Sequence, residues 1–184
     1  MIPMLSIEDA RKAGTEAGIN EEMATLNAFR ALMNSPAAAG AAAGLLRTLM
    51  YRNKLDARLR ELIILRTGWR TRSEYEFCQH AGVSRRLGMS DEEILGVRDP
   101  DACKVYSEID RAVIRMADEL HERAEITPAT WAVLERKFPP GELVELVLVS
   151  GFWRMMAGFL KTSGIPIDPV DPSFAGWPEG RKPA

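Results

Sequence analysis

The residues best suited to chemistry lie between Arg60 and Gly88, where carboxylates, hydroxyls and a histidine recur. Glu76 and His80 are four residues apart, so on a helix they share one face. Glu61 lies one helix earlier and can supply a second carboxylate. An imidazole exchanges protons near neutral pH, and a neighbouring carboxylate can hold one tautomer and stabilise the charged form. The set therefore predicts an acid–base relay that needs no metal.

Other interpretations of these patterns stay open from the residues alone. A Glu–His pair at this spacing often only decorates a helix surface. Residues 121–125 (HERAE) imitate the start of a zinc-protease helix, but Glu125 replaces the second histidine, so we interpret them as a solvated face. Cys78 is two residues from both Glu76 and His80, about 200° around a helix, and should point away from them.

Helices must position these residues, because strand signals are nearly absent and helix punctuation is frequent. Arg72, eleven residues after Glu61, shares its side of a helix if that helix continues. The pattern predicts helices over about 6–18, 21–33, 37–50, 56–70, 74–87, a short one from 90, 103–123, 127–137 and 142–162. This predicts an all-α bundle of about eight or nine helices.

Two of these predicted helices contain similar sequences, which we call the internal echo. Residues 61–70 (ELIILRTGWR) resemble residues 145–154 (ELVLVSGFWR). One interpretation is two amphipathic helices of similar composition. The other is a duplicated helical unit whose second copy has lost its polar site, because no histidine follows Trp153.

Length and composition fit one globular domain, with 184 residues, 46% apolar residues and a formal charge of −2. Basic residues are scattered, so we expect no nucleic-acid partner. The longest uncharged run in the apolar C-terminal region, 146–153, is far below the roughly 20 residues of a membrane span, so we expect no membrane partner. Two cysteines exclude a disulfide framework, leave a single bridge between Cys78 and Cys103 open, and favour a cytoplasmic location.

The stretch 56–97 resembles the carboxymuconolactone decarboxylase / alkylhydroperoxidase D (AhpD)-like superfamily. Its peroxidase branch carries a glutamate, then eleven residues, Cys-x-x-Cys, three residues and a histidine. Counting from Glu61 gives Ser73, Glu76 and His80 at the same spacing, with both cysteines replaced. Residues 74–77 (EYEF) followed by His80 are similar to a branch that reads EYEW before its histidine. Residues 142–167 also look like the later helix of longer members.

The resemblance implies an AhpD-like helical bundle that assembles as a homo-oligomer, a dimer or larger. We expect a single helical domain of this kind over 1–184, with an N-terminal helical extension of about 1–50 and a Pro/Gly-rich tail of about 165–184. The Ala/Gly-rich segment 37–44 and the apolar last helix are the candidate interface surfaces. The other expected partner is a small-molecule substrate.

The resemblance also implies a cofactor-independent proton-transfer enzyme. The model is a carboxymuconolactone decarboxylase-like lyase acting on a small organic acid or lactone, as in aromatic degradation. His80 is then the proton donor, Glu76 orients it, and Glu61 relays or holds the proton.

Substrate binding is expected from four further residues of the same stretch. The hydroxyls of Ser73 and Tyr75 would place the substrate, and Arg72 would bind a carboxylate. Trp69 completes this substrate-binding set.

Two alternatives to the lyase remain. An alkylhydroperoxidase-like, peroxidase-related antioxidant protein needs a thiolate and a resolving thiol, which Ser73 and Glu76 cannot supply. Cys78 could serve only if its helix were distorted. The other alternative is a non-catalytic binding member of the superfamily.

Overall fold

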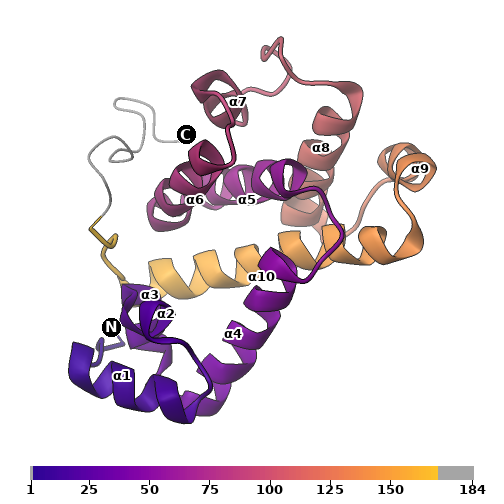
Figure 1. The fold of residues 1–184 in the computed structure, drawn as a ribbon. Coiled ribbons are helices and arrows are strands. Elements are labelled where there is room, and N and C mark those ends of the chain that lie inside the picture. The colour runs from indigo at the N-terminus through magenta and orange to yellow at the C-terminus, as the bar shows by residue number, and fades with distance from the viewer. Residues whose placement is uncertain (1, 170–184) are drawn as a thin grey trace.

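The computed structural model describes residues 2–169, which contain ten α-helices and no strand (Figure 1). This confirms the predicted all-α class, with one helix more than the upper expectation. The helices are α1 (Ile7–Glu16), α2 (Glu21–Thr25), α3 (Asn27–Leu32), α4 (Pro36–Tyr51), α5 (Ala57–Thr71), α6 (Glu74–Arg86), α7 (Asp91–Gly96), α8 (Glu108–Arg123), α9 (Pro128–Lys137) and α10 (Pro140–Ser163).

Capping and backbone breaks explain two differences from the predicted boundaries. The predicted helix 21–33 is divided because Leu26 adopts an extended backbone, with ψ of 138°. The predicted helix from residue 103 begins only at Glu108, because Ser107 and Asp110 form a reciprocal capping box there. Helices α5 and α7 begin after Asp56 and Ser90, whose side chains accept hydrogen bonds from the first turn.

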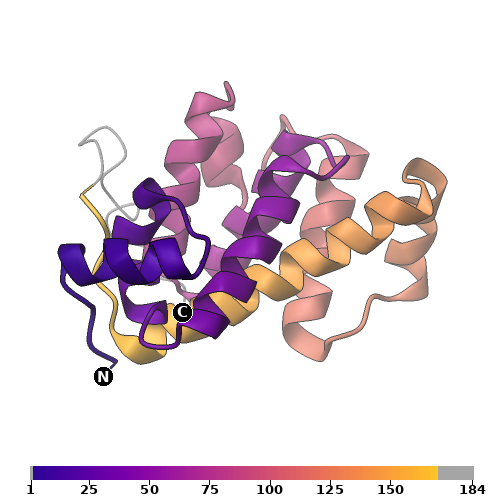
Figure 2. The same cartoon turned by 60° about the horizontal axis from the view of Figure 1, so that its bottom comes forward.

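Helix α5 is the centre of the main core. Every residue from Leu59 to Trp69 is buried, and α5 packs against α6, α8 and α10. Helix α10 runs along the length of the molecule (Figures 1 and 2). It is long and apolar enough to cross a membrane by those two measures alone, but one face packs into this core, as expected of a core helix.

The N-terminal helices form a second apolar cluster, which reaches the C-terminal end of α10 at Leu160. Ala39 and Ala43 of α4 are fully buried in it, and a side chain at Gly40 would lie 2.9 Å from the Ala17 carbonyl of the α1 end. These three small residues thus serve close packing within the chain. Ala37, Ala38 and Ala41 are exposed, and the expectation that this segment forms an interface stays a prediction.

The segment after α10 ties three parts of the chain together. The Asp168 carboxylate accepts a hydrogen bond from the backbone N–H of Asn27 at the start of α3 (2.8 Å) and another from the Tyr75 hydroxyl of α6. It therefore links the N-terminal helices to the helix that carries His80. Of the predicted tail of about 165–184, the part after residue 169 lies outside the described residues.

Candidate functional site

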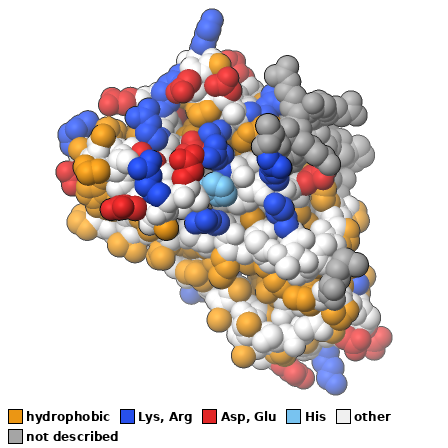
Figure 3. Space-filling view, turned by 180° about the vertical axis from the view of Figure 1, so that it is seen from behind, with side chains coloured by type: hydrophobic (Ala, Val, Ile, Leu, Met, Phe, Trp, Pro, Cys, Tyr) orange, Lys and Arg blue, Asp and Glu red, His pale blue; other side chains and the backbone are white. Residues whose placement is uncertain are grey.

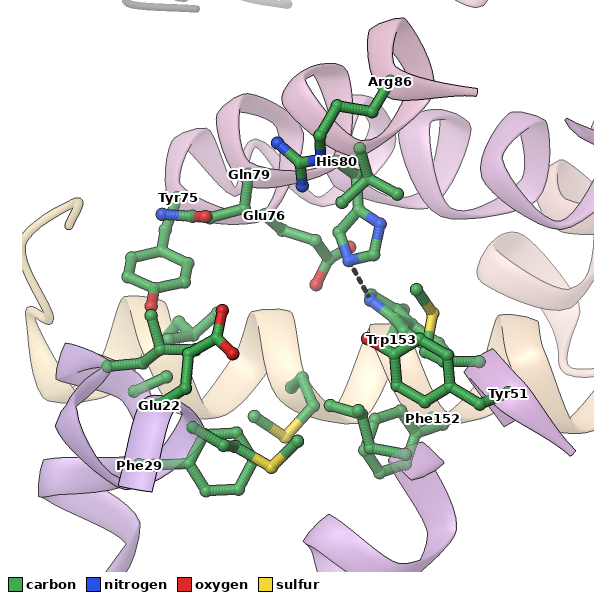
Figure 4. A pocket seen from close by; sticks show the side chains of 18 residues that line it. Glu22, Phe29, Tyr51, Tyr75, Glu76, Gln79, His80, Arg86, Phe152 and Trp153 are labelled. Atoms are coloured by element: carbon green, nitrogen blue, oxygen red, sulfur yellow. Dashed lines mark hydrogen bonds between the residues drawn. The ribbon is translucent and has the colours of Figure 1, made fainter. Parts of the chain in front are cut away.

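A cavity of about 270 Å³ lies between α6, α10 and the helices α2 to α4 (Figure 4). Its α6 wall is polar, and its opposite walls are apolar. The polar or charged side chains of α6 that line it are Tyr75, Glu76, Gln79, His80 and Arg86. The apolar lining is Met23, Leu26, Ala28, Phe29, Leu46, Met50, Phe152, Met156 and Leu160, with Val83, Tyr51, Trp153 and Glu22 completing the cavity.

His80 is held at both ring nitrogens. Its Nδ1 lies 2.7 Å from Glu61 Oε2, and the indole N–H of Trp153 donates to its Nε2 at 2.8 Å. Because an indole N–H can only donate, Nε2 must carry the lone pair and Nδ1 the proton. Neutral His80 therefore donates to Glu61. The arrangement fixes one tautomer and orients the ring edge-on to Trp153.

Glu61 is fully buried and is balanced by its neighbour. Its second oxygen accepts a hydrogen bond from Arg60 Nε at 3.0 Å, and Arg60 also donates to the Met50 carbonyl. Removal of one member of this buried group would destabilise the fold, because it would leave a buried charge or hydrogen-bond donor without its partner. Thus α5 supplies the group that orients His80, and α6 presents the ring to the cavity.

Glu76 differs from the expected orienting residue. Glu76 is only 2% exposed, and within residues 2–169 neither of its carboxyl oxygens has a hydrogen-bond partner. Burial raises the pKa of Glu76 well above its ordinary range. The protonated form of the carboxyl is therefore favoured, and the carboxyl faces the cavity beside His80 (Figure 4). The prediction that Glu76 orients His80 is wrong, because Glu61 makes that contact.

Of the four predicted substrate-binding residues, only Tyr75 lines this cavity. Its hydroxyl is engaged by Asp168, and burial together with this hydrogen bond raises the pKa of Tyr75. Ser73 is fully buried near the end of α10, and its hydroxyl has no partner. Trp69 faces another hollow and packs against Phe77.

Arg72 is also away from the cavity. Helix α5 ends at Thr71, and Arg72 adopts a left-handed conformation with φ of 57°. The helix of Glu61 therefore does not continue to Arg72, and the two residues do not share one side of a helix as predicted. Arg72 lies at the surface beside the start of α6.

The thiols lie elsewhere. Cys78 is buried and does not line the cavity, in agreement with its position on another side of α6. Cys103 is buried beside the separate hollow near α7. The two cysteines do not form a disulfide, so the bridge that the sequence left open is absent.

Residues 121–125 mark the end of α8. Arg154 and Arg70 lie near His121, and burial followed by these charges lowers the pKa of His121. Across residues 2–169 no cluster of three His, Cys, Asp or Glu side chains has an arrangement that could hold a metal ion. On the face turned away from the view of Figure 1, basic and acidic side chains alternate (Figure 3).

Sequence reasoning missed three polar residues of the site. Gln79 and Arg86 lie three and ten residues after Glu76, so helical spacing alone places them on its face. Trp153 is the tryptophan of the internal echo, but no local pattern connects it to His80, from which it is 73 residues away.

Comparisons with known proteins agree on the fold. Residues 36–119 match the model of the carboxymuconolactone decarboxylase family. No curated protein matches the chain.

Three solved structures are similar over almost the whole chain. One is an uncharacterized peroxidase-related protein from Silicibacter sp. TM1040 (16% identity, 91% of this chain and 90% of that chain, TM-score 0.73). Another is an uncharacterized peroxidase-related protein, an AhpD core, from Ralstonia eutropha JMP134 (18% identity, 94% and 92%, TM-score 0.74). The third is the debrominase Bmp8, in complex with 2,3,4-tribromopyrrole (14% identity, 91% of each chain, TM-score 0.75). At these identities the likeness establishes the AhpD-like fold.

Proposed function

We propose that this chain is a proton-transfer enzyme of the lyase type, because residues 36–119 match the model of the carboxymuconolactone decarboxylase family. Its substrate is a small organic acid or lactone, and its own side chains carry the reaction. The observation that supports this most strongly is the pairing of two unlike groups on one cavity wall. Glu76 is a buried acid whose raised pKa favours the protonated form, and His80 is a neutral imidazole with a basic nitrogen.

Glu76 is suited to give a proton to the reacting carbon. In a decarboxylation the bond to the carboxylate breaks, CO2 leaves, and the electron pair is delocalised into a conjugated carbonyl. The Glu76 carboxyl can hydrogen-bond the developing negative oxygen and then supply the proton that forms the new C–H bond. Water must return a proton to the carboxylate at the end of each cycle.

His80 is suited to take a proton and pass it on. Its Nε2 can accept a proton once the hydrogen bond from Trp153 is broken, and Glu61 then stabilises the imidazolium through Nδ1–H. His80 can therefore return a proton to Glu76 through water, or remove one from a substrate carbon. The buried Arg60 lies 3.0 Å from Glu61 and is its cationic partner.

A redox function is the second candidate, because two of the similar structures are named peroxidase-related. It requires a thiol at the reacting centre. Cys78 is buried and does not line the cavity. Under this alternative Cys78→Ser abolishes peroxide consumption, whereas under the lyase proposal it leaves CO2 release unchanged.

The test is CO2 release from a panel of carboxylated lactones that carry either one or two carboxylates. We expect His80→Gln and Glu76→Gln each to abolish release while the circular dichroism spectrum stays native. Glu74→Gln makes the same change at an exposed position of α6 and should keep full activity. Full activity in both site variants, or peroxide consumption without release from any lactone, would overturn the proposal.

A further inference from the structure

One face of α6 presents more hydrogen-bond donors to the cavity than the protein itself satisfies. Gln79 and Arg86 lie on the same face as Glu76 and His80, and all four line the cavity. The amide nitrogen of Gln79 is buried and has no hydrogen-bond partner. Figure 4 shows both side chains at the α6 side of the cavity, with the Gln79 amide directed toward Tyr75 and the Arg86 guanidinium further along the helix.

Arg86 contrasts with the arginine before it. Arg85 forms an ion pair with Asp91 at 2.8 Å. Within residues 2–169, Arg86 makes no hydrogen bond or ion pair and has no acidic neighbour that satisfies its guanidinium. Arg86 is exposed, whereas the Gln79 amide nitrogen is buried. Both groups can only donate through these nitrogens, and a carboxylate supplies two acceptor oxygens, in the geometry that arginine binds best.

The opposite end of the cavity fits an apolar group. Met23, Leu26 and Phe29 come from α2, α3 and the residue between them, outside the segment that matches the family model. Figure 4 shows Phe29 and Phe152 across the cavity from α6. A volume of about 270 Å³ is at the low end for ligand pockets, and it suits a body of the size of one ring.

The charged residues that line the cavity, Glu22 and Arg86, favour a ligand with one carboxylate. Glu22 is exposed on the α2 side and also lines the cavity. Its negative charge opposes a second carboxylate at the end where the apolar body would lie. Arg86 on the α6 side is the only Lys or Arg among the residues that line the cavity within the described chain.

We propose that Gln79 and Arg86 form a carboxylate-binding subsite, and that the ligand is a small monocarboxylic acid whose apolar, ring-sized body lies against Met23, Leu26 and Phe29. The role of this acid as substrate rests on the proposed function, but its binding does not. The subsite replaces Arg72 as the expected partner of the substrate carboxylate.

Calorimetric titration of the full chain with three probes of one shape tests the subsite. The probes are cinnamate, its uncharged amide cinnamamide, and the dianion 4-carboxycinnamate. We expect cinnamate to bind about tenfold or more tighter than either of the others, since a hydrogen-bonded charge pair is worth at least that factor. Arg86→Gln should remove this preference by weakening cinnamate and leaving cinnamamide unchanged.

Matched variants separate the subsite from general effects. Arg85→Gln removes the same charge one residue away and should change cinnamate binding by less than about twofold. Phe29→Ala should weaken cinnamate and cinnamamide equally. Equal binding of acid and amide, no binding of cinnamate, or an equal loss in Arg85→Gln and Arg86→Gln would each overturn the subsite.

His80→Gln distinguishes this proposal from the proposed function. It should abolish CO2 release but retain the preference for cinnamate over cinnamamide. If His80→Gln keeps full turnover while Arg86→Gln loses the preference, the lyase mechanism fails and the subsite stands. If the preference is absent while the His80 variant is inactive, the subsite fails and the mechanism stands.

Discussion

Replacement of Glu61 by glutamine tests the hydrogen-bond chain at its most sensitive point. The wild-type carboxylate satisfies two buried donors, Arg60 Nε–H at 3.0 Å and His80 Nδ1–H at 2.7 Å. A glutamine offers one acceptor and one N–H₂ group, so one of these donors must lose its partner. If the N–H₂ group faces His80, the imidazole can respond only by changing tautomer. Its new Nε2–H would then oppose the indole N–H of Trp153, 2.8 Å away.

The expected cost follows from these contacts. Loss of one partner of a buried ion pair typically costs about 3–5 kcal/mol, and one unsatisfied buried donor costs about 1–3 kcal/mol. Since glutamine keeps one acceptor, we expect Glu61→Gln to lower the free energy of unfolding by about 3 kcal/mol. Urea titration followed by far-ultraviolet circular dichroism measures this loss without depending on tryptophan fluorescence.

Two further variants complete this test. Glu122→Gln breaks the half-exposed ion pair with Arg70 and should cost less than about 1 kcal/mol. The double variant Arg60→Met/Glu61→Met should be less destabilised than Glu61→Met alone, because no buried charge is stranded. A loss below about 1 kcal/mol in Glu61→Gln would refute the conclusion that this carboxylate holds both donors.

Three other perturbations have defined outcomes. Trp153→Phe keeps an aromatic ring against His80 but removes the hydrogen-bond donor to Nε2. It should lower the free energy of unfolding by only about 1 kcal/mol in urea titration and should change the pH profile of turnover. An unchanged profile would show that the indole donor has no part in the relay. Burial raises the pKa of Glu76 in the fold, whereas in the unfolded chain this carboxyl ionises above its ordinary pKa of 4.5, so wild-type stability should fall as pH rises past that value. Glu76→Gln should therefore raise the melting temperature at pH 7 and leave it unchanged near pH 4, and an equal change at both pH values would contradict the raised pKa. The outer face of α10 carries three exposed apolar residues, Val144 (57%), Leu148 (45%) and Met155 (55%), and we propose that this face packs against a second copy of the chain. Leu148→Glu should then reduce the mass measured by light scattering to that of a monomer. A monomeric wild type would exclude this proposal.

The helices were largely predictable because local signals determine them. Apolar periodicity and capping residues such as Ser6 and Asp56 act within a few residues, and the observed starts of α1 and α5 follow them directly. The exceptions have local causes as well. The serine at 107 with an aspartate three residues later is a capping pattern, and recognising it would have placed the start of α8 correctly.

The site was predictable only where its residues share a helix. Spacing along α6 brought Glu76 and His80 to one face, and the same rule extends to Gln79 and Arg86. Which of two glutamates orients His80 depends instead on how α5 crosses α6. At that crossing Gly68 allows a close approach, since a side chain there would lie 3.2 Å from the Phe77 nitrogen. No periodicity in the sequence encodes this approach.

The division of the cavity between two parts of the chain has a consequence for how its function can vary. Glu61, Glu76 and His80 lie within the segment that matches the family model, whereas Met23 and Phe29 come from the helices before it. Those helices are joined to α6 through Asp168, which binds both Tyr75 and the first N–H of α3. Changes in the N-terminal helices can therefore alter the shape of the apolar end while the acid and the imidazole keep their contacts. We expect substitutions at Phe29 to change which ring is accepted and substitutions at Glu76 to change whether a proton is transferred, because the first group touches only the ligand body and the second only its reacting end.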